Sequence, residues 1–133
     1  MTTMTPTCPA ELHWCRVQLT TEPAAAAEAR RRVRAAIGSW QLPVDPAIAV
    51  LLTSELVTNA IRHAAGPAVT LAVTCSRGWL RVDVHDTSPC LPTAADVPAD
   101  AETGRGLLLV ATLADEWGFY RTTAGKAVYF TLA

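Results

Sequence analysis

The residues most suited to chemistry in this sequence are Glu55, Asn59 and His63, which recur at intervals of four in the stretch 47–64, AIAVLLTSELVTNAIRHA. That spacing places them on one face of a helix. Two apolar residues extend the same face toward the helix start, Ile48 and Leu52. The opposite side carries a second apolar stripe, Val50, Val57 and Ile61. A helix that is apolar on both sides is predicted to be buried, so its polar side chains have little exposed face to occupy.

A buried carboxylate without a partner is costly, so Glu55 and Asn59 must be accommodated in one of two ways. Either they satisfy each other and nearby backbone groups, or they face a wet cavity or a bound ligand. The ends of this helix carry clear signals. Asp45 is placed to cap the first turn with Pro46 at the first helical position, and Gly66-Pro67 ends the helix.

A second unusual carboxylate closes the stretch 79–86. Alternation of apolar and polar residues predicts a strand there, and period two puts Asp86 on the same face as Leu80, Val82 and Val84. The side chain of Asp86 then either caps the end of the strand or accepts a hydrogen bond from a ligand at the edge of the core.

A third segment is the glycine pair around Arg105. The proline-containing loop 87–103 runs into Gly104-Arg105-Gly106, which precede a helix predicted over about 107–114. A helix start offers unpaired N–H groups, and glycine lets phosphate oxygens approach the backbone. The alternative is a plain turn before a helix.

The remaining pattern predicts one domain over residues 11–133 behind a loose tail at 1–10. An irregular strand at 11–20 precedes an alanine-rich helix that begins after Thr20-Thr21-Glu22-Pro23 and ends near Gly38. Two hairpins are expected, 68–76 with 79–86 around Arg77-Gly78, and 117–122 with 126–133 around Thr123-Ala124-Gly125. The first helix carries four arginines, which form either a solvated face or a surface for an acidic partner: Arg30, Arg31, Arg32 and Arg34.

Composition limits the classes of function. Half of the 133 residues are hydrophobic and the net charge is −1, which gives no electrostatic reason to expect direct nucleic-acid binding. No apolar run reaches 18 residues and the N-terminal stretch lacks the features of a signal peptide, so no membrane span and a cytoplasmic location are expected. The cysteines show no zinc-binding spacing and are expected to be free thiols in a reducing compartment: Cys8, Cys15, Cys75 and Cys90. The four tryptophans are mostly candidates for the core, with Trp14 or Trp40 a candidate for a protein interface.

Three segments stand in a fixed order: ELVTNAIRH at 55–63, VHDTSP at 84–89 and GRGL at 104–107. Together they resemble the N, G1 and G2 boxes of the GHKL ATPases, the superfamily of gyrase, Hsp90, histidine kinases and MutL. Within it, the chain is most similar to small actinobacterial anti-sigma-factor serine/threonine kinases. The resemblance implies the Bergerat fold, an α+β two-layer sandwich of a mixed, mainly antiparallel sheet with helices on one face. ATP lies between the helices and a loop in that fold.

The resemblance also implies roles. Asn59 would coordinate Mg²⁺ on the phosphates of ATP, Glu55 would act as the general base, and Asp86 would accept the adenine amino group. The phosphates would be bordered by Gly104, Arg105, Gly106 and Leu107, with 87–103 as a short lid and His63 and Ser88 near the nucleotide. These roles are chemically consistent because Mg²⁺ prefers oxygen ligands and phosphoryl transfer depends mostly on positioning and charge stabilisation. Two positions depart from the family: Ser88 replaces the usual glycine, and Ala127 stands where a threonine often helps to hold adenine.

By this resemblance the chain would be a protein-serine kinase that uses Mg-ATP to phosphorylate an anti-anti-sigma factor of the STAS type and sequesters a sigma factor. It would be a homodimer, paired through its first strand and helix. The alternative is a regulatory module that binds the sigma factor or its antagonist without phosphorylating it. A detached histidine-kinase catalytic domain is disfavoured, because His13, His63 and His85 do not lie on a dimerisation helix.

Overall fold

The computed structural model describes residues 12–63, 66, 68–87 and 102–133, and for residues 102–107 only the backbone. The predicted tail at 1–10 lies outside these ranges. The elements follow in the order β1 (His13–Thr20), α1 (Ala24–Trp40), α2 (Pro46–His63), β2 (Ala68–Ser76), β3 (Trp79–Asp86), α3 (Glu102–Leu113), β4 (Glu116–Arg121) and β5 (Lys126–Leu132).

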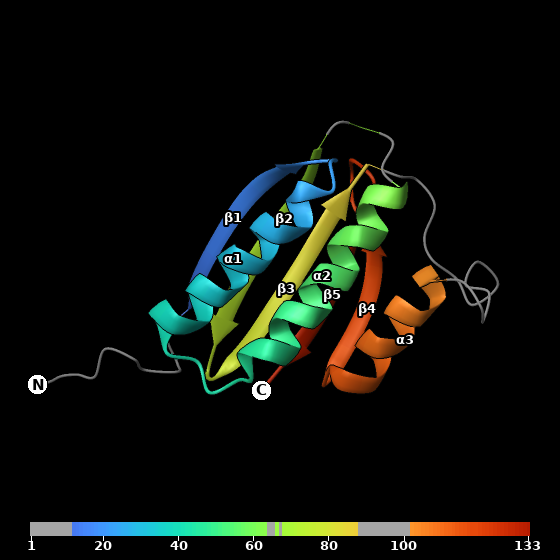
Figure 1. The fold of residues 1–133 in the computed structure, drawn as a ribbon. Coiled ribbons are helices and arrows are strands. Elements are labelled where there is room, and N and C mark those ends of the chain that lie inside the picture. The colour runs from blue at the N-terminus through green and yellow to red at the C-terminus, as the bar shows by residue number, and fades with distance from the viewer. Residues whose placement is uncertain (1–11, 64–65, 67, 88–101) are drawn as a thin grey trace, which may run out of the picture.

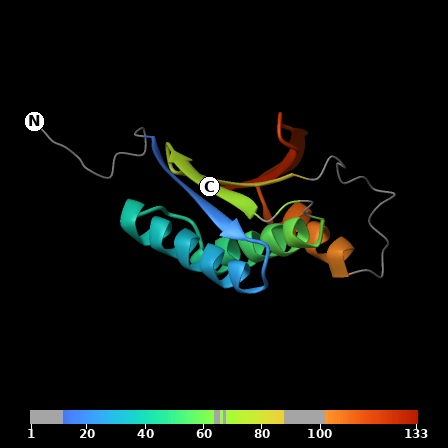
Figure 2. The same cartoon turned by 90° about the horizontal axis from the view of Figure 1, so that it is seen from above.

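The strands form a five-stranded sheet in the order β1-β2-β3-β5-β4, and every pairing between neighbours in it is antiparallel. The helices pack on one face of this sheet, so the molecule has two layers, as Figures 1 and 2 show. Among the described residues no helix lies on the other face, which we call the open face. The predicted two-layer α+β sandwich is therefore confirmed, and its mainly antiparallel sheet is antiparallel throughout the described strands.

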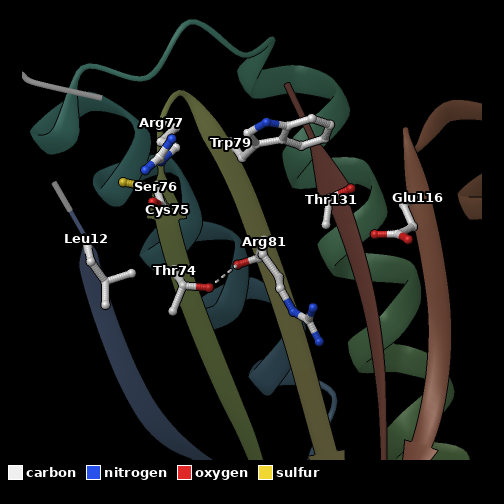
Figure 3. A pocket seen from close by; sticks show the side chains of 9 residues that line it. All are labelled: Leu12, Thr74, Cys75, Ser76, Arg77, Trp79, Arg81, Glu116 and Thr131. Carbon is white, nitrogen blue, oxygen red and sulfur yellow. Dashed lines mark hydrogen bonds between the residues drawn. The ribbon is translucent and has the colours of Figure 1, made fainter. Parts of the chain in front are cut away.

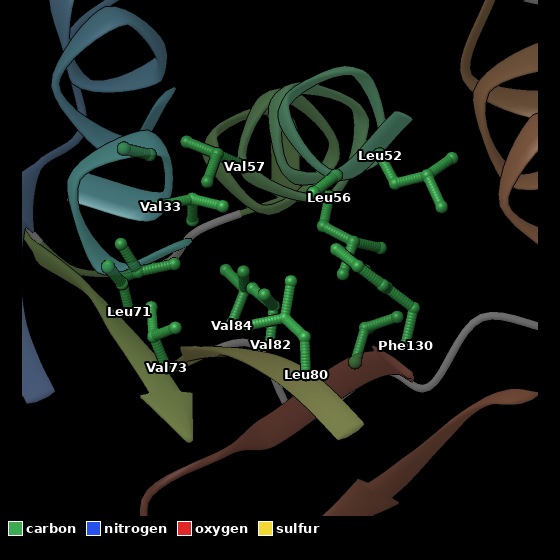
Figure 4. Close-up of a cluster of buried hydrophobic side chains, with 14 of the residues drawn as sticks. Val33, Leu52, Leu56, Val57, Leu71, Val73, Leu80, Val82, Val84 and Phe130 are labelled. Atoms are coloured by element: carbon green, nitrogen blue, oxygen red, sulfur yellow. The ribbon is translucent and has the colours of Figure 1, made fainter. Parts of the chain in front are cut away.

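Helix α2 is the centre of the helical layer. Its predicted start is confirmed, since Asp45 Oδ1 accepts a hydrogen bond from the Ala47 N–H at 2.9 Å and Pro46 is the first helical residue. Its sheet-facing residues are buried in the core beneath the strands, among them Leu52, Leu56 and Val57. Figure 4 shows these side chains meeting the apolar rows of the sheet, which include Val73, Val82 and Phe130.

Helix α1 covers β1 and β2 and packs along α2. It ends at Trp40 rather than near Gly38, because the left-handed turn that stops it is made by Gln41 with φ of 53°. Of its four arginines, Arg31, Arg32 and Arg34 are exposed, as expected for a solvated face. Arg30 is half-buried and donates a hydrogen bond to Ser54 Oγ on α2 at 3.0 Å, so it ties the two helices together.

The tryptophans differ from the sequence prediction. The exposed fraction of Trp14 is 66% and that of Trp79 is 46%, while Trp40 and Trp117 are half-buried. The prediction that most of them are core residues is therefore wrong. The reason is register: pairing of β1 with β2 and of β2 with β3 places Trp14 and Trp79 on the open face, where no second layer covers them.

Candidate functional site

The polar face of α2 lies on the side of the helix toward α3. In Figure 4 Leu52 points toward α3 while Val57, on the other side of α2, points toward α1. Glu55 and Asn59 are three and seven residues after Leu52, so they project from the same side as Leu52. Helices α2 and α3 are in contact. The predicted polar stripe thus faces the junction of α2 with α3.

Asn59 is buried at 6% exposure, and its Oδ1 atom has no hydrogen-bond partner within the described residues. Glu55 is half-buried, and no hydrogen bond joins it to Asn59 in that part of the chain. The reading in which the two side chains satisfy each other is therefore not the arrangement found. A buried amide oxygen without a donor is a group that a cation or ligand can satisfy.

Asp86 closes the row Leu80, Val82, Val84 on the covered face of β3, as the period-two pattern predicts. It is 4% exposed. Its Oδ2 atom lies 3.6 Å from Lys126 Nζ, and the two side chains are 1% and 3% exposed. The side chain that meets the carboxylate from the neighbouring strand is therefore a lysine.

The register of β3 with β5 places Lys126 opposite Asp86. Asp86 pairs with Lys126, and His85 pairs with Ala127. Side chains alternate between faces, so Lys126 lies on the covered face with Asp86 while Ala127 lies on the open side with His85. Ala127, which departs from the threonine that the resemblance expects there, therefore lies on the face away from Asp86. The missed residue could have been found from the alternation itself, because Lys126 begins the buried row Val128, Phe130, Leu132.

Three segments of the chain approach one another closely at Gly66 and Gly125, near the end of β3 that carries Asp86. A Cβ atom built on Gly66, just beyond α2, would lie 3.0 Å from Thr87 Oγ1. A Cβ atom on Gly125, in the β4–β5 turn, would lie 2.6 Å from Thr87 Cα and would also meet the carbonyl oxygen of Asp86. The end of α2, the end of β3 and the β4–β5 turn are thus in close contact, and Figure 1 shows them at the same edge of the molecule.

The structure describes some of the other predicted residues, and the rest lie outside the described ranges. His63 is exposed in the last turn of α2. Ser88, most of the predicted lid 87–103, Cys8 and Cys90 lie outside the described residues, whereas Cys15 and Cys75 are free thiols. Burial raises the pKa of both of these thiols.

The third predicted segment differs from expectation. Helix α3 begins at Glu102, not at about Leu107, so Gly104, Arg105, Gly106 and Leu107 lie inside its first turns rather than before it. The first four residues of a helix have N–H groups without intrahelical partners, and here these four include Gly104 and Arg105 but not Gly106 or Leu107. The predicted boundary was therefore wrong, and the phosphate-binding role of the segment stays a prediction.

The open face carries a separate polar cluster, which we call the Asp83 cluster. Arg81 Nε and NH2 donate hydrogen bonds to the two oxygens of Asp83 at 2.8 and 3.0 Å, and Tyr120 OH donates to Asp83 Oδ2 at 2.9 Å. The guanidinium also lies 4.0 Å from the centre of the Tyr129 ring. The hydrogen bonds to Asp83 raise the pKa of Arg81, and burial followed by its own bond to Asp83 raises the pKa of Tyr120.

A shallow hollow of about 400 Å³ lies beside this cluster, at the β2–β3 turn end of the open face. Figure 3 shows Trp79, Arg81 and Thr131 lining it, with Thr74 Oγ1 bonded to the carbonyl oxygen of Arg81 at 3.5 Å. None of the predicted site residues lines it, so the hollow is separate from the junction of α2 and α3. Within the described ranges no three His, Cys, Asp or Glu side chains gather as a metal site, so a cation at Asn59 would need ligands from its substrate.

The layered fold and the meeting of these segments define the class of the protein: it is built as a GHKL ATPase domain. The family profile described as "Histidine kinase-like ATPase domain" matches residues 19–132, and the chain belongs to that family. ATP binding is the property that this family implies.

Comparison with solved structures supports the fold. The chain superposes with a TM-score of 0.66 on the crystal structure of the RsbU and RsbW domains of Rv1364c from Mycobacterium tuberculosis, at 20% sequence identity. The match covers 90% of this chain and 32% of that one, so this chain spans about a third of that protein's length. Comparison with curated protein sequences gives no match. In the described part of the chain, no helix has the length and apolar character needed to cross a membrane.

Proposed function

We propose that this chain is an anti-sigma-factor-type protein-serine kinase. It binds Mg-ATP at the junction of α2 and α3, phosphorylates an anti-anti-sigma partner of the STAS type, and sequesters a sigma factor in the cytoplasm. The observation that carries the proposal is the buried Oδ1 atom of Asn59, which has no hydrogen-bond partner in the described residues and lies on the same helix side as Glu55. The family to which the chain belongs supports ATP as the ligand.

Each side chain has one task in this proposal. Asn59 supplies an amide oxygen to Mg²⁺, and the ion neutralises charge on the phosphates. Glu55, one turn earlier, accepts the proton of the attacking serine hydroxyl, a contribution of roughly 10²–10⁴-fold for a well-placed base. The carboxylate of Asp86 accepts a hydrogen bond from the adenine amino group. The first turn of α3, with Gly104, borders the phosphates through backbone N–H groups.

A second candidate function is a regulatory module that binds the same partners without transferring phosphate. The ion pair between Lys126 and Asp86 favours it, because the carboxylate expected to receive adenine already has a cationic neighbour. In this alternative the domain retains the fold and its contact surfaces, and ATP has no catalytic role.

Phosphate transfer distinguishes the two functions. The purified chain is incubated with γ-labelled ATP, Mg²⁺ and candidate STAS proteins, and label on the partner is followed with wild type, Glu55→Gln and Asn59→Ala. The kinase reading expects transfer by wild type, a fall of at least 100-fold in both variants, and unchanged partner binding. Thr58→Ala is the matched control, since Thr58 is exposed on the same helix. Partner binding without any transfer by wild type would establish the regulatory module instead.

Homodimerisation is part of the proposal. Strand β1 is at the edge of the sheet and leaves one side without a strand neighbour among the described strands. Trp14 on this strand is 66% exposed, which supports an interface there. Sedimentation velocity of wild type and Trp14→Ala tests this, with a shift from dimer toward monomer expected in the variant. A wild-type monomer at high micromolar concentration would remove dimerisation from the proposal.

A further inference from the structure

Lys126 is the only lysine in the sequence, and it is almost completely buried. Its ammonium lies 3.6 Å from Asp86 Oδ2, and both side chains are on the covered face of the sheet. A charge-assisted hydrogen bond between ammonium and carboxylate has a typical length of about 2.7–2.9 Å. The contact is longer, so these two atoms form an ion pair without a short hydrogen bond between them.

We propose that Lys126 competes internally with the nucleotide base for Asp86, so that this chain recognises its nucleotide by the phosphates and discriminates weakly between bases. The inference rests on the proposed function, because it takes Asp86 as the acceptor for the base. It concerns a residue and a specificity that the proposed kinase activity does not require.

The chemistry of the two donors explains the competition. A lysine ammonium has three N–H donors and no acceptor, and the exocyclic amino group of adenine is likewise a donor. Both therefore need an acceptor oxygen of Asp86. A charged donor is the stronger of the two, and separating a buried ion pair leaves both charges short of partners. The ammonium is already placed beside Oδ2, so adenine must share the carboxylate with it or displace it.

The packing around Asp86 makes a simple outward rotation of its side chain difficult. The backbone of Asp86 and Thr87 lies directly against Gly125, the residue before Lys126. Val84 and Val128, one pair further along the two strands, are buried in the core at 0% and 3% exposure. The backbones that carry the carboxylate and the ammonium are therefore held side by side by the same pair of strands.

Nucleotide binding to wild type tests the inference without any mutation. Inosine triphosphate carries a carbonyl oxygen where ATP carries the amino group and an N–H at N1 where ATP has an acceptor, so it lacks the amino donor that would reach Asp86. Calorimetry with Mg²⁺ is expected to give dissociation constants for ATP and inosine triphosphate that agree within threefold. A preference for ATP of more than twentyfold would overturn the inference while leaving the proposed kinase intact.

Lys126→Thr removes the ammonium and leaves a hydroxyl. This variant is expected to bind ATP at least tenfold more tightly than wild type, with little change for inosine triphosphate. Arg121→Thr is the matched control: it removes the same charge from the exposed residue that pairs with Lys126 across β4 and β5, and no change is expected. An affinity for ATP unchanged by Lys126→Thr, in a variant with a wild-type circular dichroism spectrum, would overturn the inference.

A measurement on the wild-type side chain covers the case in which Lys126→Thr does not fold. Because the sequence has one lysine, lysine labelled with ¹³C at Cε gives one signal. Saturating Mg-ATP is expected to shift that signal, since the ammonium must share Asp86 with adenine or leave it, and inosine triphosphate is expected to shift it less. An unmoved signal at saturation would overturn the inference. Failure of wild type and Lys126→Thr to bind either nucleotide would instead remove the proposed function on which it rests.

Discussion

Asp83 and Asp86 lie three residues apart on β3 and face opposite sides of the same sheet. Asp83, on the open face, accepts three hydrogen bonds of 2.8 to 3.0 Å from Arg81 and Tyr120. Asp86, on the covered face, meets Lys126 at 3.6 Å although it is the more deeply buried of the two, at 4% against 7% exposure. Because a more deeply buried carboxylate loses more of its hydration, Asp86 would be expected to have the closer hydrogen-bond partners of the two.

This difference separates two uses of a carboxylate. The Asp83 cluster is satisfied within the chain, so it stabilises the sheet and needs no ligand. Asp86 Oδ2 and Asn59 Oδ1 are buried without a hydrogen bond in the described part of the chain, which is the pattern expected where a ligand completes a site. The comparison predicts that substitutions near the covered-face site impair nucleotide binding, whereas substitutions in the Asp83 cluster affect stability alone.

The largest effect is expected from Gly125→Ala, which acts on the covered face. The new Cβ atom would lie 2.6 Å from Thr87 Cα and closer still to the Asp86 carbonyl oxygen, both backbone atoms that cannot rotate away. A loss of about 3 kcal/mol in the free energy of unfolding is expected, together with loss of nucleotide binding. Urea denaturation measures the stability change.

Gly38→Ala is the control for this prediction. A Cβ atom on Gly38 meets nothing within 4 Å, and Gly38 lies inside α1. The substitution is expected to stabilise the chain by about 0.5–1 kcal/mol through helix propensity. Equal stabilities for Gly125→Ala and wild type would contradict the close approach of the β4–β5 turn to β3.

Asp83→Ala acts on the open face and has the next largest expected effect. It removes the acceptor for Arg81 and Tyr120, and a destabilisation of about 1–2 kcal/mol is expected because Arg81 is partly exposed and regains water. Affinity for Mg-ATP should be unchanged, because the cluster lies on the other side of the sheet. A parallel loss of nucleotide affinity, with the fold intact, would show that the two faces are coupled.

Asn59→Leu has a smaller effect on stability and the opposite sign. It replaces a buried amide whose Oδ1 atom lacks a donor within the described residues by an apolar side chain of similar size. The ligand-free protein is expected to gain about 1 kcal/mol, while Mg-ATP binding is lost. Thermal unfolding with and without Mg-ATP checks both parts. Destabilisation of the ligand-free variant would indicate that Asn59 has a structural role.

The smallest effect concerns pH. Burial lowers the pKa of His85, so the imidazole stays neutral in the folded chain at pH values where the unfolded chain takes up a proton. Stability is therefore expected to fall as pH drops below the ordinary histidine value of about 6.5. Urea midpoints at pH 7.5 and 5.5 for wild type and His85→Asn measure this, with a smaller pH dependence expected in the variant. An equal dependence in both proteins would assign it to other groups.

Much of the fold follows from local sequence patterns. The hairpin of β2 and β3 has the boundaries that the alternation predicts, because one face of each strand must enter the core. Helix α2 likewise begins where Asp45 and Pro46 place it. Elements whose ends depend on tertiary packing were placed less well. Helix α3 begins five residues earlier than predicted, since glycine disfavours a helix locally and only the fold around it offsets that preference.

The candidate site was predicted in part for a similar reason. Glu55, Asn59 and Asp86 stood out because polar side chains on apolar faces violate the local pattern. Lys126 was missed because a lysine at the first position of a strand reads as an exposed end. Alternation along β5 puts Lys126 on the buried face, but its pairing with Asp86 depends on the register of β5 against β3, which one strand does not contain.

The placement of the tryptophans has a practical consequence for spectroscopy. Trp14 and Trp79 are largely exposed, and Trp40 and Trp117 are only half-buried, so the native chain has no indole sealed in its core. The emission spectrum of the folded protein should already lie toward long wavelengths, and unfolding should change it little. A macromolecule that covers the open face or the β1 edge should shift that emission to the blue, which gives a label-free signal for titrations.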